Sequence, residues 1–480
     1  MIVKTAFEKY DNDIQELVKS FEMMGDTGNY SLFVDGGWRS DDEFNVTVTG
    51  DAFGNFIKVY SFKVTDTDRL YEGGSLSLAA DAVAKRLEKR YLKIALYRTM
   101  SFLTGINLPY GALTGIRPSK LYTELKGTGL VDDIFSKDFS VSPDKLSLIK
   151  KIAENQEKSR PESDKCVNVF INIPFCPTRC AYCSFISATT AKYADKLEYY
   201  KDCLIKELAL LKTIVDENNF VVRSVYVGGG TPTSFSTPLL SEILATAADF
   251  NPREFTVEAG RPDTLNAQKV KALKAAGVTR VSVNPQTFND KTLETIGRAH
   301  SAEDTVKAFK LTRKHFITNM DLIAMLPGED FSDFKYSLDK AVSLAPDNIT
   351  VHMLSMKKGS VLKLSDYKVE NSALASQMID YAAEALRVAG YNPYYMYRQK
   401  YAGGSLENTG YARHGKECVY NIDIMEERTS ILAAGAGAIS KKLIPAENRI
   451  ERQADFKGID DYLNRFEEVL ERTRSLWKKS

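Results

Sequence analysis

The chain has 480 residues and a net charge of +1, and 44% of its residues are hydrophobic and 26% charged. This length suggests two or three domains, and the near-zero net charge argues against a polyanion-binding surface, so we expect no nucleic-acid partner. No apolar run reaches the roughly 18 residues of a membrane-spanning helix, and we expect no membrane contact. The N-terminal stretch carries acidic residues and lacks the apolar segment of a secretion signal. We therefore expect the cytoplasm, where thiols stay reduced.

Residues 1–160 are expected to form a separate α+β domain. Two strands joined by a turn, a long helix and a short helix are predicted in it, over residues 44–50, 56–65, 78–103 and 114–125. The strands alternate apolar and polar residues, the long helix is rich in Ala, Leu, Lys and Arg, and a proline precedes the short helix. The polar stretch 153–165 predicts a linker. Nothing in this domain names a function: it could bind substrate, cap the next domain or contact a partner.

After residue 160, short strands alternate with helices, which is typical of parallel sheets with right-handed crossovers. Val167, Val169, Ile171 and Ile173 share one strand face, and an apolar stripe over 197–215 predicts an amphipathic helix. Further strands are predicted in SVYVGGG, EFTVEAG, RVSVNPQ, NMDLIAMLPG, NITVHMLSM and YNPYYMYRQ. About seven such strands would form a closed or partly open barrel, with ligands at the carboxyl ends of the strands. From about residue 400 the pattern is less regular, with small residues in LAAGAGAISKK.

Three of the six cysteines, Cys176, Cys180 and Cys183, lie within eight positions of each other. Three thiolates on a short loop can hold three irons of a [4Fe–4S] cluster and leave the fourth iron open to an outside ligand. The alternative is a zinc site completed by a remote histidine, although none of the four histidines stands at finger spacing. The remaining cysteines are expected to be small buried hydrophobes; they are Cys166, Cys203 and Cys418.

Two features near these cysteines indicate a ligand. The glycines at 228–230 end a predicted strand and let the backbone approach a ligand closely, with the hydroxyls of Thr231 and Thr233 beside them. The Lys-Ser/Thr pair of a phosphate-binding loop does not follow, so this is not a nucleotide P-loop. Tyr182, directly before the third cysteine, either faces a bound ring or simply packs.

With these motifs the chain resembles the radical S-adenosylmethionine (SAM) superfamily, and within it the oxygen-independent coproporphyrinogen III oxidases. The resemblance covers about residues 165–440, through IPFCPTRCAYCSF, GGGTPT, TVEAGRPDTL, NPQTFNDKTLETIGRAH and DLIAMLPGE. LTGIRPSKL and YNIDIMEE also occur in the branch of that family with an extra N-terminal region. The resemblance implies an α/β fold with a partial (β/α)6 barrel over 161–400. The N-terminal α+β domain would precede it, and a smaller C-terminal region, 401–480, would complete the SAM and substrate site.

The resemblance also implies a [4Fe–4S] cluster on the three cysteines and one or two SAM molecules, the first bound to the open iron and cleaved to methionine and a 5′-deoxyadenosyl radical. The residues that it implies around SAM are Phe170, Tyr182, Gly229, Gly230, Thr231, Glu258, Gln286, Arg298, Asp321 and Ile439. Read without it, Glu258 is a solvated or capping acid, Arg298 a surface residue and Asp321 a salt-bridge partner. No catalytic side chain is implied, because the cofactor carries the chemistry. Many relatives have Tyr and His where this chain has Phe170 and Asn172, a difference that bears on SAM positioning and on the substrate, and not on the cluster.

The activity implied is the anaerobic dehydrogenation of coproporphyrinogen III in haem biosynthesis, in which two propionates lose CO2 and become vinyl groups. The expected partners are the porphyrinogen and an electron donor such as flavodoxin or ferredoxin, and we expect a monomer. Two alternatives stay open. One is a haem-binding chaperone with nearly the same core motifs, and the other is a radical SAM enzyme that acts on another substrate.

Overall fold

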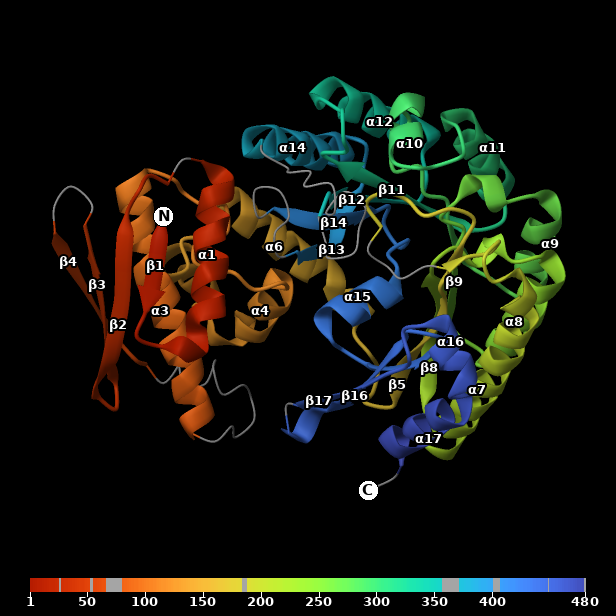
Figure 1. Ribbon diagram of the computed structural model, residues 1–480, viewed down its shortest axis with the longest axis horizontal. Coiled ribbons are helices and arrows are strands. Elements are labelled where there is room, and N and C mark those ends of the chain that lie inside the picture. Colours follow the sequence, from red (N-terminus) through yellow and green to blue (C-terminus); the bar gives the residue numbers. More distant parts are fainter. Residues whose placement is uncertain are drawn as a thin grey trace.

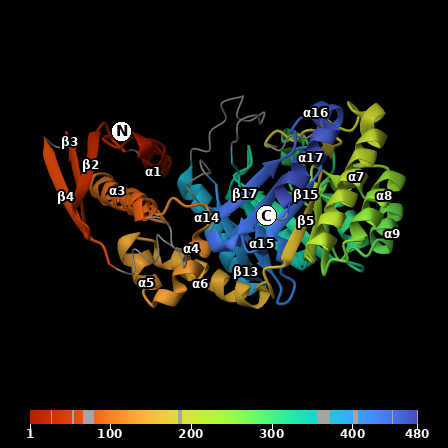
Figure 2. The ribbon, with the colours of Figure 1, turned by 90° about the horizontal axis from the view of Figure 1, so that it is seen from below.

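The computed structural model describes residues 1–25, 27–51, 55–65, 80–183, 188–355, 371–399, 406–447 and 449–478. An N-terminal region of one sheet and several helices lies beside a larger region built around a second sheet (Figure 1). The view from below shows the same two regions side by side (Figure 2). Within the described ranges, no helix is both long enough and apolar enough to cross a lipid bilayer.

The N-terminal region confirms the predicted α+β class. Its sheet has the order β1-β2-β3-β4, and α1 and α3 pack against it. The bounds are β1 (Ile2–Thr5), α1 (Asp11–Met24), β2 (Ser31–Ser40), β3 (Glu43–Gly50), β4 (Phe56–Lys63), α3 (Ala80–Thr104) and α4 (Pro118–Leu125). Val34, Val46 and Val48 are fully buried because alternate strand residues face the helices. The predicted strands and helices are therefore present, while part of the predicted turn at 51–55 lies outside the described residues.

The predicted linker at 153–165 is wrong at its start. Helix α6 (Pro143–Gln156) continues into it, and a short 3-10 turn (Glu157–Ser159) follows. Ile152, Ala153 and Gln156 are buried while Glu154 between them is exposed, so the polar letters are the outer face of an amphipathic helix. Helix α5 (Val131–Asp133) precedes α6.

The second sheet confirms the partial (β/α)6 barrel. Six parallel strands lie next to one another in chain order: β5 (Cys166–Ile173), β8 (Val221–Gly229), β9 (Glu254–Glu258), β10 (Arg280–Ser282), β11 (Ile317–Ala324) and β12 (Asn348–Met353). The helices that connect and follow them are α7 (Leu197–Glu217), α8 (Thr237–Ala248), α9 (Ala267–Ala275), α10 (Asp290–Thr295), α11 (Ala302–Thr312), α12 (Phe331–Leu344) and α14 (Ser372–Val388). In Figure 1 these helices form an outer arc around the strands.

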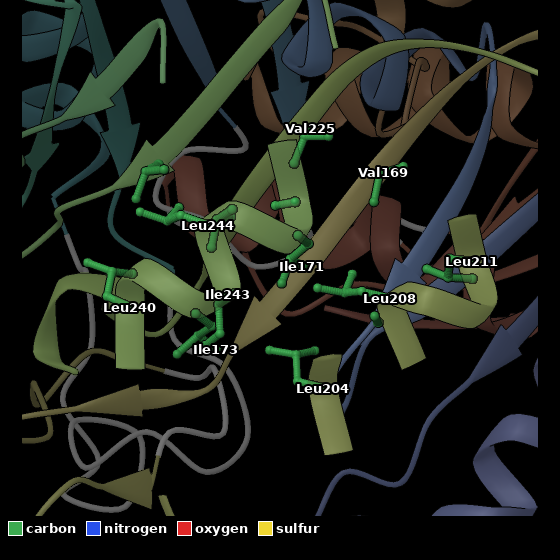
Figure 3. Packing of buried hydrophobic residues seen from close by; sticks show 14 of the residues in the cluster. Val169, Ile171, Ile173, Leu204, Leu208, Leu211, Val225, Leu240, Ile243 and Leu244 are labelled. Carbon is green, nitrogen blue, oxygen red and sulfur yellow. The ribbon is translucent and has the colours of Figure 1, made fainter. Parts of the chain in front are cut away.

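The main core lies between these strands and their helices. Val169, Ile171 and Ile173 of β5 point toward α7 and α8 (Figure 3). The residues that they meet there include Leu204, Leu208, Leu211, Leu240, Ile243 and Leu244. Burying each such side chain stabilises the fold by about 1.5–3 kcal/mol. Because side chains alternate along a strand, Phe170 and Asn172 lie on the opposite, inner face of the barrel.

The seventh predicted strand, β13 (Asn392–Arg398), does not extend the parallel series. It pairs antiparallel with β14 (Glu407–Ala412), which pairs antiparallel with β12. Only eight residues separate β13 from β14, enough for an antiparallel hairpin and too few for a parallel crossover.

The region after residue 400 is more regular than predicted. It contains α15 (Val419–Glu426), β15 (Ser430–Ala434), β16 (Ile439–Ile444), β17 (Arg449–Ala454), α16 (Ile459–Asn464) and α17 (Phe466–Trp477). Strand β15 joins the barrel sheet parallel to β5, and β16 and β17 follow antiparallel. The small residues that hid this strand from pattern reading are almost completely buried at Ala433 and Ala434.

Candidate functional site

A cavity of about 370 Å³ lies within the barrel, and most of the predicted site residues line it. Those residues are Cys176, Cys180, Tyr182, Cys183, Gly229, Gly230, Thr231, Glu258, Gln286, Arg298 and Asp321. They come from five different strands or the loops after them, and the parallel order of the strands brings them together. Phe170 and Ile439 do not line the cavity. The binding role of each residue stays a prediction.

The cysteine loop is fixed by its neighbours. Strand β6 (Phe175–Cys176) pairs with β7 (Ala188–Thr189), and the Cys176 Sγ lies 3.3 Å from the Thr231 Oγ1. The Ala181 N–H donates to the Ile296 carbonyl at 2.9 Å, which anchors the loop between the second and third cysteines. Burial raises the pKa of the Cys176 thiol to about 11, so this thiol must lose a proton when it binds a metal.

The donor set fits a cluster. All six cysteines are thiols in the structure, and three of them line one cavity. In the part of the chain that the structure describes, no three His, Cys, Asp or Glu side chains surround the position of a single ion. Cubane clusters bind each cysteine through a different iron, so their ligands need not meet at one point. The other cysteines are buried as predicted, and they are Cys166, Cys203 and Cys418.

The strand-end glycines pack against the strand that carries the cysteine loop. Gly229 has φ +97°, and a Cβ there would collide with the side-chain oxygen of Asn172. A Cβ at Gly230 would lie 2.5 Å from the Phe175 carbonyl oxygen. The Asn172 Nδ2 also donates to the Ala436 carbonyl at 2.6 Å. Glycine is therefore required here by contact between β8 and the β5–β6 segment, in addition to any approach of a ligand.

Glu258, the last residue of β9, is half-buried in the cavity wall. The Tyr226 hydroxyl donates to its Oε1 at 2.5 Å. Burial raises the pKa of Glu258 to about 7, and the hydrogen bond from Tyr226 offsets this only in part. The carboxyl group therefore titrates near neutrality and is neither a freely solvated acid nor a helix cap.

Asp321 on β11 faces a histidine that the sequence did not single out. The His352 Nε2 lies 3.8 Å from the Asp321 Oδ2, and its Nδ1 lies 3.1 Å from the Tyr397 hydroxyl. The Asn319 amide donates to the Asp321 Oδ1 at 2.8 Å. Although burial acts to raise it, the nearby His352 and the hydrogen bond from Asn319 hold the pKa of Asp321 below its usual value. Asp321 thus carries a negative charge into the cavity, beside an imidazole.

Gln286 and Arg298 present buried polar atoms to the same cavity. Gln286 has φ +66°, and within the described ranges its Oε1 is buried without a hydrogen-bond partner. Arg298 is 8% exposed, so it is not a surface residue; it donates to the Asn284 carbonyl at 2.7 Å and to the Tyr182 hydroxyl at 3.1 Å. Its Nε is likewise buried and unpartnered among the described residues. Such atoms fit a site that a polar ligand completes.

Two predicted residues lie apart from this group. The Phe170 ring lies 6.3 Å from that of Tyr226 and 6.1 Å from that of Tyr420, within an aromatic cluster. Ile439 begins β16 and is 46% exposed.

Sequence reasoning missed many of the residues that line the cavity, among them Tyr226, His352 and Tyr397. Tyr226 stands two residues before the glycines, and His352 is the second-last residue of β12. Strand alternation and the carboxyl-end rule were signals that could have found both. Tyr397 is likewise the second-last residue of β13, so the same two signals applied to it.

Comparison with known proteins identifies the family. The Radical SAM superfamily profile matches residues 171–341. The oxygen-independent coproporphyrinogen-III oxidase-like protein HemZ of Bacillus subtilis (strain 168) is 35% identical over 444 residues, which cover 89% of this chain and 87% of that protein. The chain belongs to this radical SAM family.

A second sequence relative and a solved structure also match the chain. The heme chaperone HemW of Haemophilus influenzae is 28% identical over 306 residues, covering 62% of this chain and 76% of that protein. The solved structure of coproporphyrinogen III oxidase (HemN) from Escherichia coli, described as a radical SAM enzyme, superimposes with a TM-score of 0.51 at 20% identity, covering 66% of this chain and 73% of that one. This last match supports the fold. Radical SAM family membership implies a [4Fe–4S] cluster and SAM, which the three thiols and the unpartnered atoms of Gln286 and Arg298 fit.

Proposed function

We propose that the protein catalyses the oxygen-independent oxidative decarboxylation of two propionates of coproporphyrinogen III, giving protoporphyrinogen IX. The observation that carries the proposal is one cavity that the three cysteines, the end of β8, Glu258 and Asp321 line together with tyrosines from β13. Such a cavity offers one place for SAM and an adjoining aromatic place for a flat substrate. The extent of the match to the HemZ protein supports the same activity.

The chain's own part is to position the reactants. A [4Fe–4S] cluster held by Cys176, Cys180 and Cys183 would, together with SAM, supply the radical chemistry that removes a hydrogen atom from the β-carbon of a propionate. The propionate then releases CO2 and one electron to an acceptor and becomes a vinyl group. Gly229 and Gly230 hold the cysteine loop against β8, and Glu258 and Asp321 place carboxylates near the cationic SAM. The protein contributes to catalysis by holding the β-carbon of the propionate close to the bound SAM.

A haem-binding chaperone is the second candidate, favoured by one feature of the cavity. His352 brings an imidazole into the wall beside Tyr397, and imidazole is a common axial ligand of haem iron. The similarity to the heme chaperone HemW is in keeping with this alternative.

One anaerobic experiment separates these functions. Reduced protein with a reconstituted cluster is incubated with SAM and coproporphyrinogen III, beside a Cys180→Ala control. We expect CO2, 5′-deoxyadenosine and a porphyrin with two fewer carboxylates from the wild type only. Stoichiometric haem binding without decarboxylation would favour the chaperone. Deoxyadenosine without any change in the porphyrin would indicate another substrate.

A further inference from the structure

One wall of the cavity is built from β13 and α15, and we call it the tyrosine wall. It consists of Tyr394, Tyr395, Tyr397, Asn421 and Met425, all of which line the cavity. Both elements lie between the barrel and the N-terminal region, next to α4 and α6 (Figures 1 and 2). The wall therefore has the cavity on one side and the N-terminal region on the other.

The N-terminal region holds β13 from behind. The Met396 side chain is fully buried in the hydrophobic core of the N-terminal region, while its neighbours in β13 face the cavity. The Asn155 amide of α6 donates to the Pro393 carbonyl at 2.7 Å, and the Gln156 amide donates to the Tyr394 carbonyl at 2.9 Å. Strand β13 is thus hydrogen-bonded to β14 along one edge. The first residues of β13 are also hydrogen-bonded to the last residues of α6.

Helix α4 holds the end of α15. The buried Ser119 hydroxyl donates to the Glu426 Oε1 at 2.7 Å. Arg117 and Lys120 contact the carboxylate of Glu427 at 2.6 and 2.8 Å. Although burial acts to raise it, hydrogen bonds from Lys120 and Arg117 lower the pKa of Glu427 to about 2. These contacts join two sequence strings that were noticed separately, LTGIRPSKL and YNIDIMEE.

Gln156 takes part in both sets of contacts, those with β13 and those with α15. Its Nε2 donates to the Tyr394 carbonyl on β13 and, at 3.1 Å, to the Glu426 Oε1 on α15. Its own Oε1 accepts a hydrogen bond from the Arg428 Nη2 at 3.2 Å. The side chain is fully buried, so water cannot replace these bonds when the amide is removed.

We propose that residues 113–156 are a brace that sets the position of the tyrosine wall, with Gln156 and Ser119 as positioning residues. The hydrogen bonds and ion pairs of the brace described above reach the backbone of β13 and the carboxylates that end α15, so it acts on the shape of the cavity through the tyrosine wall. This role belongs to the chain's geometry and does not depend on which molecule the cavity accepts.

The test compares Gln156→Met with Lys150→Met. Both changes lie on α6, but the Lys150 ammonium group pairs with Asp132 and forms none of the hydrogen bonds described above that join α6 to β13 and α15. Hydrogen exchange read by mass spectrometry over residues 392–398 and 419–426 reports on the wall, and iron content after reconstitution reports on the cluster. Binding of coproporphyrin III, followed by its fluorescence, reports on the cavity. Ser119→Ala provides a second variant in case the methionine variant does not fold.

We expect amide exchange in both segments to be about tenfold faster in Gln156→Met, as loss of a hydrogen bond to a charged group predicts, and unchanged in Lys150→Met. Iron content should match the wild type, and coproporphyrin III should bind about tenfold more weakly. Wild-type exchange in both segments of a folded Gln156→Met or Ser119→Ala variant would overturn the brace. So would equal acceleration in Lys150→Met. If neither the wild type nor any variant bound coproporphyrin III, the proposed substrate would be wrong. The exchange rates would still test whether residues 113–156 position the tyrosine wall.

Discussion

Tyr226 on β8 donates a 2.5 Å hydrogen bond to Glu258 at the end of the neighbouring strand β9. The pair joins two parts of the cavity wall, because Gly228 packs beside it: a Cβ at that glycine would lie 2.9 Å from the Glu258 carboxyl carbon. Burial raises the pKa of Glu258 to about 7, so small changes around the carboxyl group alter its charge at neutral pH.

SAM binding should therefore depend on pH through Glu258. SAM carries a positive sulfonium, and we expect the ionised carboxylate to bind it better, so affinity should rise from pH 6 to pH 8. Tyr226→Phe removes a hydrogen bond that favours the ionised form, which raises the pKa of Glu258 and moves the rise to higher pH. Calorimetric titration with SAM across this range measures the shift. Tyr60→Phe, which loses a hydroxyl bonded to Thr99 in the N-terminal region, is the control; identical profiles for both variants would contradict the prediction.

Stability of the protein without its cofactors should also follow Glu258. Its pKa rises from 4.5 in the unfolded chain to about 7 in the folded one, so the protonated form is favoured by folding. The stabilisation is fully present below pH 4.5 and is lost as pH rises through about 7. In Glu258→Gln the fall in the free energy of unfolding between pH 5 and pH 8 should shrink by roughly 1–3 kcal/mol. Urea denaturation at the two pH values measures this, and the exposed Glu467→Gln should keep the wild-type difference.

The sequence predicted the barrel well because its strands and helices have strong local periodicity. The apolar face of β5 and the stripe of α7 both fall in the core between strands and helices. The carboxyl-end rule then brought cysteines, glycines and acids from separate strands to one cavity. These are local patterns combined with one topological rule, and they needed no knowledge of distant contacts.

The rest depended on contacts between distant residues. The antiparallel β13–β14 pair and the parallel β15 are decided by which edge of the sheet is free, and the alanines of β15 give little strand signal. Gln156 read as part of a polar linker because its partners, Tyr394 and Glu426, are 238 and 270 residues away. A buried amide of this kind has no sequence signature of its own.

The cysteine triad can be tested against a buried cysteine of the same barrel. Cys176→Ala, Cys180→Ala and Cys183→Ala should each abolish the cluster, whereas the reconstituted wild type should bind about four irons and four sulfides. Cys203 is 1% exposed in the helix-facing core, so Cys203→Ala should keep the cluster and lose about 1–2 kcal/mol of stability. Iron and sulfide analysis together with thermal unfolding measures both effects. A full cluster in any one of the triad variants would exclude that cysteine as a ligand.

Gly230 distinguishes a ligand-approach role from a packing role. A Cβ at this position would lie 2.5 Å from the Phe175 carbonyl oxygen and 2.7 Å from its nitrogen, so Gly230→Ala must displace β6 and with it Cys176. We expect lower iron content as well as weaker SAM binding, and a loss of about 1–3 kcal/mol in the free energy of unfolding. Anaerobic reconstitution followed by iron analysis and SAM titration measures the first two.

Gly260 is the matched control because it lines the same cavity in ordinary surroundings. A Cβ there would meet only the Asn284 amide nitrogen, at 3.7 Å, which is normal van der Waals contact. Gly260→Ala should therefore keep full iron content. If Gly230→Ala also kept full iron and lost only SAM binding, the glycine would serve the ligand and not the cysteine loop. If both losses appear together in Gly230→Ala, contact between β8 and β6 holds the cysteine loop in register with the SAM site, and one glycine serves both.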